Sequence, residues 1–105
     1  EHEITYAVTR LLRSRLSQNP LLTDIAATLN LTERTLRRQL TAAGIGFRQL
    51  HDRVRSEEAT QLLQKEHLTI AEVGNAVGFR DVREFRRAFK RWTGVPPRAA
   101  RMTAG

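Results

Sequence analysis

Two stretches of this 105-residue chain match each other when the second is shifted by 48 positions. The matching apolar or small residues are Leu22 and Ile70, Ile25 and Val73, Ala26 and Gly74, Leu29 and Val77, and Leu31 and Phe79. After one inserted residue in the second stretch, the pairs are Leu36 and Phe85, Arg37 and Arg86, Arg38 and Arg87, and Leu40 and Phe89. Apolar residues three and four positions apart share one face of an α-helix, so each stretch predicts a short helix, a turn and a second helix.

The turn of each copy carries a residue type that tolerates positive φ, Asn30 in the first copy and Gly78 in the second. The small residues Ala26 and Gly74 lie where the partner helix must approach closely. Two helices joined in this way form a helix-turn-helix, which lays its second helix in the major groove of DNA. One copy would be weak evidence, because many helical hairpins look alike. Two copies, each with basic residues on the exposed face of its second helix, strongly favour this unit.

The rest of the chain shows helical periodicity and no strict alternation of apolar and polar residues, so we expect an all-α fold. The first helix has an apolar face from Ile4 to Leu16 and ends before the Asn19-Pro20 breaker. The expected helices cover residues 4–16, 23–29, 32–43, 47–65, 69–77 and 81–92, and a basic tail follows. The predicted N-caps of the later helices are Thr32, Thr69 and Asp81.

A long helix over residues 47–65 is expected between the two copies. Its roughly 19 residues would span about 28 Å, while major grooves on one face of B-DNA recur about every 34 Å. One monomer could therefore place its two units in adjacent grooves without dimer symmetry. We divide this single domain into a first helix-turn-helix subdomain with the N-terminal helix (1–45), a linker helix (46–66) and a second helix-turn-helix subdomain (67–105).

Basic charge is concentrated near the C-terminus. The chain holds 18 Lys and Arg against 11 Asp and Glu, a net charge of +7. Residues 80–105 hold eight of these basic residues against Asp81 and Glu84, a net charge of +6. This asymmetry indicates a polyanionic partner, nucleic acid ahead of an anionic membrane, with a merely solvated basic surface as the alternative. Sixteen of the 18 cations are Arg, whose planar fork suits phosphates and guanine edges, and this favours nucleic acid.

Several classes of function lack the residues that they need. The chain has no Cys, which removes disulfides, thiolate metal sites and thiol nucleophiles, and no apolar run approaches the ~18 residues that span a membrane. His2, His51 and His67 show no metal-ligand spacing. With no nucleophile–base pair, clustered carboxylates or glycine-rich phosphate loop, we expect no enzyme, no metal and no cofactor. Because the chain starts at Glu1 rather than Met, we expect it to be a piece of a longer protein.

The most specific motif lies in the second copy. It comprises the runs Val77-Gly78-Phe79-Arg80-Asp81, Phe85-Arg86-Arg87-Ala88-Phe89-Lys90-Arg91-Trp92 and Gly94-Val95-Pro96-Pro97. These runs resemble the signature of the DNA-binding domain of the AraC/XylS family of bacterial transcription regulators: Gly-Phe, then Phe-x-x-x-Phe-Lys, then Gly-x-x-Pro. The runs Ile25-Ala26, Thr32-x-x-x-Leu36-x-Arg38 and Ile70-Ala71-Glu72-Val73 also fit. The resemblance covers roughly residues 21–101.

The family resemblance implies about seven helices, with two helix-turn-helix units joined by a long linker helix. It implies double-stranded DNA as a partner, contact with RNA polymerase, and an upstream domain that binds an effector or dimerises. We expect this piece to be monomeric, without a membrane partner, and to act at the nucleoid in the bacterial cytoplasm. The alternative is a basic helical module that binds RNA or an anionic surface. Single-strand recognition normally needs exposed aromatic residues, and those of this chain are expected to be buried.

In the first recognition helix, Arg34, Arg37 and Arg38 share an exposed arc, because residues three and four apart are neighbours on a helix. The resemblance places base contacts on these three residues, through bidentate Arg–guanine bonds worth ~1–3 kcal/mol of discrimination each. A solvated face or an ion pair with Glu33 is the alternative. Thr32, which opens this helix, could offer its hydroxyl and backbone N–H to phosphate.

In the second recognition helix, the positions that match the family's groove-facing positions are Val82, Arg83, Arg86 and Arg87. The expected base contacts are Arg83, Arg86 and Val82. Of these, Val82 could pack on a thymine methyl group. The expected phosphate contacts are Arg87, Lys90 and Arg91, the last two because they lie farther along the helix. Arg87 has a structural alternative, an ion pair with an acidic residue such as Glu72. Asp81 is expected to act as a cap, since its charge would repel phosphate.

Three departures from the family pattern affect these expectations. Val82 stands where members often place a polar residue, so we expect no side-chain hydrogen bond at that base step. No aromatic residue precedes Arg101, so the C-terminal segment should pack less firmly. Gly74 replaces a usual Ala and should cost the helix about 1 kcal/mol. The aromatic residues that we expect in the core, rather than stacked on bases, are Phe79, Phe85, Phe89 and Trp92.

Overall fold

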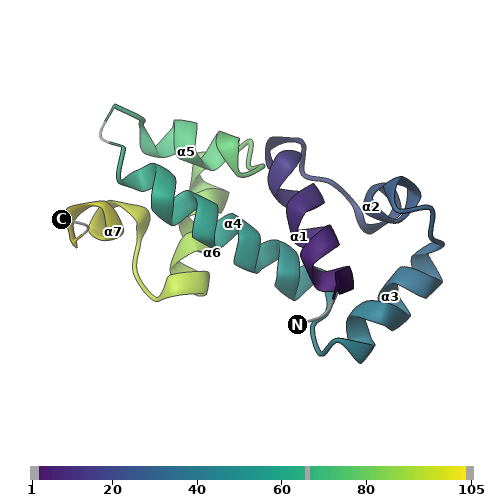
Figure 1. The fold of residues 1–105 in the computed structure, drawn as a ribbon. Coiled ribbons are helices and arrows are strands. Elements are labelled where there is room, and N and C mark those ends of the chain that lie inside the picture. The colour runs from purple at the N-terminus through teal and green to yellow at the C-terminus, as the bar shows by residue number, and fades with distance from the viewer. Residues whose placement is uncertain (1–2, 66, 104–105) are drawn as a thin grey trace.

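The computed structural model describes residues 3–65 and 67–103, and this part of the chain forms seven α-helices, one short 3₁₀ helix and no strand. The all-α class and the helix count implied by the family resemblance are confirmed. The helices are α1 (Glu3–Ser14), the 3₁₀ helix η1 (Leu16–Gln18), α2 (Leu22–Thr28), α3 (Glu33–Ala42), α4 (Phe47–Leu63), α5 (Ile70–Ala76), α6 (Val82–Thr93) and α7 (Pro97–Thr103). Figure 1 shows α4 as a central rod, with α2 and α3 at its N-terminal end and α5, α6 and α7 towards its other end.

Two of the predicted helices end two residues earlier than expected. The first helix ends at Ser14, and Leu16 lies in η1, which is followed by Asn19 in the left-handed conformation with φ 54°. The linker helix α4 has 17 residues and ends at Leu63 rather than near Lys65. At 1.5 Å per residue it spans about 25 Å, slightly less than the sequence predicted.

The segment predicted as a basic tail is helix α7, so that prediction was wrong. Pro97 suits the first position of a helix because it has no N–H to leave unpaired. Arg101 anchors α7 to the end of α4, because its Nε donates to the Leu63 carbonyl at 2.7 Å. Its Nη2 donates to the carbonyls of Leu68 at 2.6 Å and Lys65 at 3.3 Å. The charge of Arg101 is therefore used within the fold, although the sequence assigned it to the basic surface.

One hydrophobic core runs through both helix-turn-helix units. Helix α1 contributes the fully buried Val8 and Leu12 to it. Helix α6 contributes the buried Phe85 and Phe89, and the other expected core aromatics, Phe79 and Trp92, are partly buried against the same cluster. Because the two units share one core around α4, the domain is a single elongated body with principal extents of 41, 23 and 19 Å.

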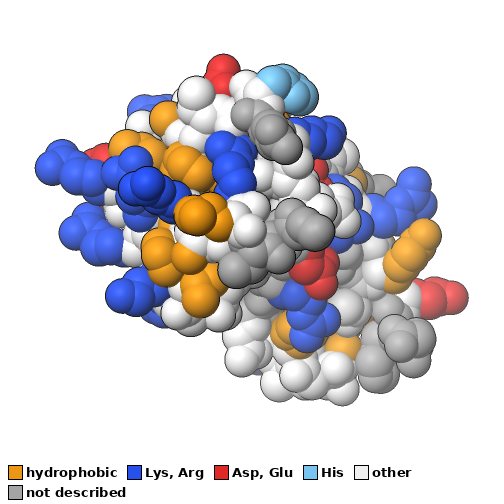
Figure 2. Space-filling model, turned by 90° about the vertical axis from the view of Figure 1, so that its left-hand side faces the viewer, with side chains coloured by type: hydrophobic (Ala, Val, Ile, Leu, Met, Phe, Trp, Pro, Cys, Tyr) orange, Lys and Arg blue, Asp and Glu red, His pale blue; other side chains and the backbone are white. Residues whose placement is uncertain are grey.

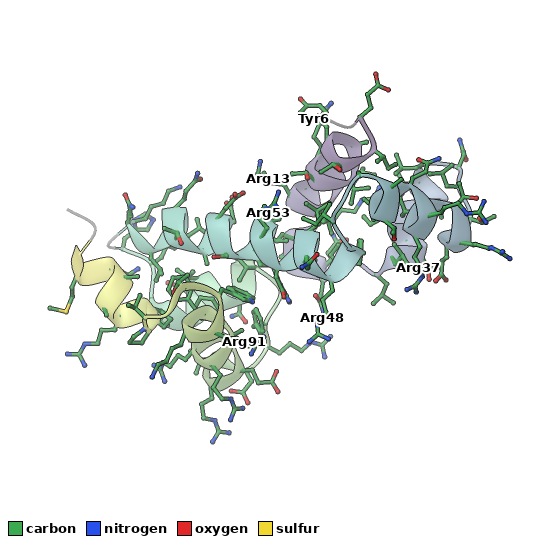
Figure 3. All side chains as sticks on the ribbon, turned by 90° about the horizontal axis from the view of Figure 1, so that it is seen from below. Tyr6, Arg13, Arg37, Arg48, Arg53 and Arg91 are labelled. Atoms are coloured by element: carbon green, nitrogen blue, oxygen red, sulfur yellow. The ribbon has the colours of Figure 1, made fainter. Side chains whose placement is uncertain are left out.

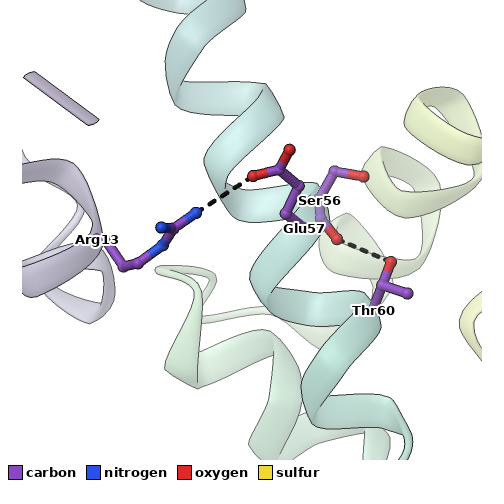
Figure 4. A network of polar contacts seen from close by, with 4 residues as sticks. All are labelled: Arg13, Ser56, Glu57 and Thr60. Carbon is purple, nitrogen blue, oxygen red and sulfur yellow. Dashed lines mark hydrogen bonds and ion pairs between the residues drawn. The ribbon is translucent and has the colours of Figure 1, made fainter. Parts of the chain in front are cut away.

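Helix α1 packs across α4 and is joined to it by a polar contact (Figure 1). Arg13 donates to the carboxylate of Glu57 at 3.2 Å, and the nearby Thr60 hydroxyl donates to the Ser56 carbonyl at 2.8 Å (Figure 4). The side chains of Arg13 and Glu57 are both half exposed, so their ion pair contributes at most about 1 kcal/mol. Apolar packing is therefore the main interaction that holds α1 in place.

The two copies of the sequence repeat share the same backbone arrangement. In each copy the residue after the turn donates its N–H to a carbonyl five positions earlier at 2.9 Å; the pairs are Leu31 with Ala26 and Phe79 with Gly74. The turn residues Asn30 and Gly78 have positive φ angles of 59° and 102°. The repeat therefore corresponds to two helix-turn-helix units, α2–α3 and α5–α6.

Two glycines of the second unit allow close packing. A Cβ on Gly74 would lie 3.0 Å from the Phe85 ring, so the missing methyl group lets α5 approach α6. This contact is a structural reason for Gly rather than Ala at position 74. A Cβ on Gly78 would lie 2.9 Å from the carbonyl oxygen of Leu16, so the second turn rests directly on η1.

The three predicted N-caps are confirmed. The Thr32 hydroxyl accepts the N–H of Thr35 at 3.1 Å. Thr69 and Glu72 form a reciprocal capping box, with N–H···O distances of 3.0 and 2.8 Å. The Asp81 carboxylate accepts a backbone N–H of its own helix at 2.8 Å. These caps satisfy N–H groups that the first turn of a helix otherwise leaves unpaired, and they fix where α3, α5 and α6 begin.

Candidate nucleic-acid interface

Helix α3 presents three exposed arginines to solvent. Leu36 and Leu40 are buried, with exposed fractions of 0% and 1%, so the opposite side of the helix faces outward. At about 100° per residue, Arg38 points directly away from these leucines, Arg34 lies close to it, and Arg37 lies at the flank. All three predicted base-contacting residues are exposed.

Arg37 forms an ion pair with Glu33, which is the alternative to a role in binding DNA. Its Nη2 lies 3.6 Å from the carboxylate of Glu33, one helical turn earlier. The Arg37 side chain is still 68% exposed, and a pair of this kind contributes only about 0.3–0.5 kcal/mol. Arg37 therefore remains available to a partner. Within the described residues, no ion pair involves Arg34 or Arg38.

Helix α6 presents a larger basic face. Its exposed basic residues are Arg83, Arg86, Arg87, Lys90 and Arg91. They span about 140° of the helix circumference, from Arg86 to Arg91, and are centred opposite the buried aromatic face. Glu84 is the one acidic residue of this helix, and it is also exposed. Val82, at the first helical position, is half-buried.

Asp81 caps α6, and the groups beside it stabilise its ionised form. Its Oδ1 accepts the backbone N–H of Arg83 at 2.8 Å and lies 3.7 Å from the side-chain Nε of Arg83. The backbone hydrogen bond, and after it the positive charges of Arg83 and Arg87, lower the pKa of Asp81. Asp81 therefore stays ionised and acts as the expected cap.

The hydrogen bonds and ion pairs around Thr32 and Arg87 affect whether these residues can contact phosphate as predicted. The Thr32 hydroxyl donates to Thr35 Oγ1 at 3.0 Å, so it must turn away from Thr35 before it can donate to a phosphate. Arg87 is exposed, and no ion pair in the described part of the chain joins it to Glu72. Glu72 instead accepts the N–H of Thr69 at 2.8 Å. The alternative prediction that Arg87 forms an ion pair with Glu72 is therefore wrong.

Basic residues of both units lie on the same side of the linker helix. In Figure 3, Arg37 of α3, Arg48 at the start of α4 and Arg91 of α6 lie on one side of the α4 rod. The labelled residues on the other side are Tyr6, Arg13 and Arg53. Figure 2 looks at the end of the molecule that carries α7 and shows Lys and Arg side chains gathered along one edge of this end.

Sequence reasoning missed Arg48. This exposed residue lies in the first turn of α4 and lines a hollow that residues 19–22, α3 and α4 form, together with Arg37 and Thr41 of α3. Arg48 and Arg37 belong to different helices, and no periodic pattern relates them. Only the turn of the chain at Gly46 brings these two cations to one surface.

His51 lines the same hollow but is buried, with an exposed fraction of 8%. Its ring centroid lies 5.8 Å from that of Phe47. Burial, and after it the charge of Arg55, lower the pKa of His51 from 6.5 to about 4, although Asp52 acts in the opposite direction. His51 is therefore neutral at pH 7 and adds no charge to the interface.

The lowered pKa of His51 makes the stability of the domain depend on pH. The unfolded chain takes up this proton near pH 6.5 and the folded chain near pH 4, so unfolding becomes easier as the pH falls between these values. We expect the free energy of unfolding, measured by urea denaturation, to decrease by roughly 2–3 kcal/mol from pH 7 to pH 4.5. In a His51→Leu variant the part of the decrease that His51 causes should disappear. The part that the protonation of carboxylates causes should remain. Equal pH dependence in the two proteins would contradict the placement of His51.

Two other kinds of site, a metal centre and a membrane span, are absent from residues 3–65 and 67–103. No group of three or more His, Asp or Glu side chains there is arranged to hold a metal ion. No helix there combines the length and the apolar character that a bilayer crossing requires. Because they gather exposed basic side chains, the outward faces of α3 and α6 are the candidate functional surface.

Comparison with known proteins identifies the family of this chain. A family model described as a helix-turn-helix domain matches residues 25–103. An uncharacterized HTH-type transcriptional regulator of Mycobacterium tuberculosis is 42% identical over 94 residues, which cover 86% of this chain and 27% of the relative. The crystal structure of the transcriptional regulator CdpR from Pseudomonas aeruginosa is similar with a TM-score of 0.86 and 38% identity, over 94% of this chain and 31% of that chain.

The fold alone is also shared with an AraC-type DNA-binding domain-containing protein from Chromobacterium violaceum, with a TM-score of 0.85 and 23% identity over 94% of this chain and 89% of that chain. The chain spans about a quarter of the length of the curated relative it matches. The matched proteins are transcriptional regulators rather than enzymes. By its two helix-turn-helix units, its family match and these relatives, the chain belongs to the AraC-type (AraC/XylS) family of helix-turn-helix transcriptional regulators.

Proposed function

We propose that this chain binds double-stranded DNA sequence-specifically and inserts α3 and α6 into two adjacent major grooves. The observation that carries the proposal is that both second helices present exposed arginines from one rigid body built around α4. We take residues 1–105 as one DNA-binding domain, with a first subdomain (1–45), a linker helix (46–66) and a second subdomain (67–105).

The dimensions of the molecule support the two-groove arrangement. Its longest extent of 41 Å exceeds the ~34 Å between adjacent major grooves on one face of B-DNA. The other two extents, 23 and 19 Å, fall short of it. Both helices can therefore reach adjacent grooves only when the long axis of the domain lies along the DNA.

We assign base reading to the residues that match the positions at which the family resemblance implies contact with bases. In α3 these are Arg34, Arg37 and Arg38, and in α6 they are Val82, Arg83 and Arg86. Arginine binds guanine O6 and N7 with two parallel hydrogen bonds, and an apolar side chain such as Val packs on a thymine methyl group. Phosphate contacts are assigned to Thr32, Arg87, Lys90 and Arg91, which would position the helices without reading sequence.

The alternative of single-stranded RNA binding is disfavoured by where the aromatic side chains lie. Stacking on unpaired bases needs exposed rings. Phe85 and Phe89 are buried, and Phe79 and Trp92 are packed against the core. Tyr6 is 67% exposed, but it lies across α4 from Arg37 and Arg91 (Figure 3).

The rest of the regulator is proposed from the family. The relatives are several times longer than this chain, which is consistent with an upstream domain that binds an effector or dimerises. We propose that the present piece is monomeric, needs no cofactor, contacts RNA polymerase when bound to DNA, and acts at the nucleoid in the bacterial cytoplasm. Any effector would act through the upstream domain.

The experiment that tests the proposal selects binding sites from random double-stranded DNA with this chain and then footprints the selected sites. We expect enriched sequences with two half-sites centred about 10 base pairs apart on one face of the duplex. The same footprint on unselected DNA, or protection of one short half-site only, would contradict the proposal.

The division between reading and anchoring residues has its own test. We expect Arg37→Ala to relax base preference in one half-site, since it removes a contact worth ~1–3 kcal/mol of discrimination. Arg91→Ala should instead weaken binding to all sequences alike and reduce the salt slope by about 1. Binding measured on a panel of single-base variants of the selected site separates the two effects, and identical profiles for both proteins would show that the division is wrong.

A further inference from the structure

Arg55, in the middle of α4, is a cation inside the fold. Its side chain is only 15% exposed, and it forms an ion pair with Asp52, one turn earlier on α4. Its Nε is buried and has no hydrogen-bond partner within residues 3–65 and 67–103. Burying a charged group is unfavourable unless its surroundings stabilise it. The contacts around Arg55 must therefore compensate for its burial.

Two aromatic rings of the second unit provide this compensation. The guanidinium carbon of Arg55 lies 4.9 Å from the centroid of Phe79 and 5.2 Å from that of Trp92. Phe79 directly follows the turn of the second helix-turn-helix, and Trp92 lies in the last turn of α6. One side chain of the linker helix thus contacts a residue near each end of α6. The planar, weakly hydrated guanidinium suits this stacking better than the compact ammonium group of Lys.

A second contact ties the same turn to η1, which precedes the first unit. Gly78 approaches the carbonyl oxygen of Leu16 so closely that a Cβ would lie 2.9 Å from it. Arg55, Gly78 and Phe79 also line one hollow, together with residues 17–19. The second turn is therefore held between α4, through Arg55, and η1, through Gly78.

We propose that Arg55 is a positioning residue that fixes the second helix-turn-helix unit on α4 and so sets the half-site spacing that the domain accepts. This inference rests on the proposed function. One added base pair shifts a half-site by about 3.4 Å along the duplex and turns it by about 35°. A rigid domain cannot follow this change, whereas a domain without the contact between Arg55 and the rings can adjust α6 to it.

The first test measures binding to the selected site and to versions with one base pair added or removed between the half-sites. We expect the wild-type chain to lose about 100-fold in affinity on the altered sites, the equivalent of two lost base contacts. In Arg55→Met this penalty should shrink to about 10-fold. The matched control is Arg53→Met, an exposed arginine of the same helix, which should keep the full penalty.

The second test needs no DNA. The chain has no cysteine, so spin labels can be placed at Gln39→Cys on α3 and Glu84→Cys on α6, both exposed positions outside the assigned contacts. We expect a narrow distance distribution in the otherwise wild-type chain and a broad one with Arg55→Met. Arg55→Lys keeps the charge opposite Asp52 but lacks the planar group, and it should give an intermediate width.

The outcomes separate this inference from the proposed function. An unchanged distribution or an unchanged spacing penalty in folded Arg55 variants overturns the positioning role. Loss of folding in both variants, checked by circular dichroism, also overturns it, because it assigns Arg55 to stability alone. If the wild-type chain shows no sequence preference, the proposed function fails and the spacing claim falls with it. A distribution that broadens in Arg55→Met still establishes that Arg55 fixes the second unit.

Discussion

Replacing Phe89 with Ala is expected to lower the free energy of unfolding by about 3–5 kcal/mol. Phe89 is 1% exposed, and its ring centroid lies 5.9 Å from that of Phe85 and 6.5 Å from that of Trp92. The substitution removes these contacts and leaves a cavity that the close-packed core can fill only in part. Since domains are typically stable by only about 5–15 kcal/mol, urea denaturation followed by circular dichroism should show a much lower midpoint.

The matched control for this prediction is Arg91→Ala, an exposed position on the same helix, which should change stability by less than about 0.5 kcal/mol. The sequence predicts that Phe89→Ala unfolds the second unit. Because the structure shows one core shared by both units, we expect α1 to α4 to be destabilised as well. An unchanged midpoint for Phe89→Ala would contradict the packing of α6 described above.

Binding to the selected DNA site should weaken steeply as salt is added. If about six phosphates are neutralised, the slope of log K against log salt is near −5, at about −0.9 for each contact. Raising the salt concentration from 50 to 200 mM should then reduce the affinity by about 10³-fold. Fluorescence anisotropy with labelled duplexes at several salt concentrations measures this slope.

Variants on the two sides of α4 provide the controls for the salt prediction. Lys90→Ala on the basic face of α6 should flatten the slope by about 1. Arg53→Ala also removes one positive charge, but it lies on the other side of α4 from Arg37 and Arg91 and should leave the slope unchanged. A slope near −1 for the wild-type chain, or equal flattening by both variants, would count against the assigned interface.

Local patterns predicted most of the fold because the signals for it lie within a few residues. Apolar spacing predicted the helices up to α6, and Asn30 and Gly78 predicted the two turns. The N-caps Thr32 and Asp81 were recognisable because a cap binds an N–H only two or three residues away. Helix α7 was missed by pattern alone, since its main anchor, Arg101, binds carbonyls more than 30 positions away in the chain.

The candidate site also has a part that local patterns predict and a part that they do not. That the arginines of α3 and α6 are exposed follows from their phase relative to buried residues on the same helix, and the structure agrees. That Arg48 joins Arg37 at one hollow, and that the side chain of Arg55 is largely buried against Phe79 and Trp92, do not follow from any local pattern. The residues next to Arg48 and Arg55 in the sequence do not distinguish either one from an exposed arginine of the same helix, such as Arg53.

The sequence by itself determined that this chain forms helices, that two pairs of them repeat, and which faces of the second helices are basic. These properties depend on neighbours within about one or two helical turns. Only the tertiary structure decided which cations remain on the surface and how the two units are held together. Whether a charge is stabilised by water or by buried rings and carbonyls depends on groups far away in the chain, as Arg55 and Arg101 show.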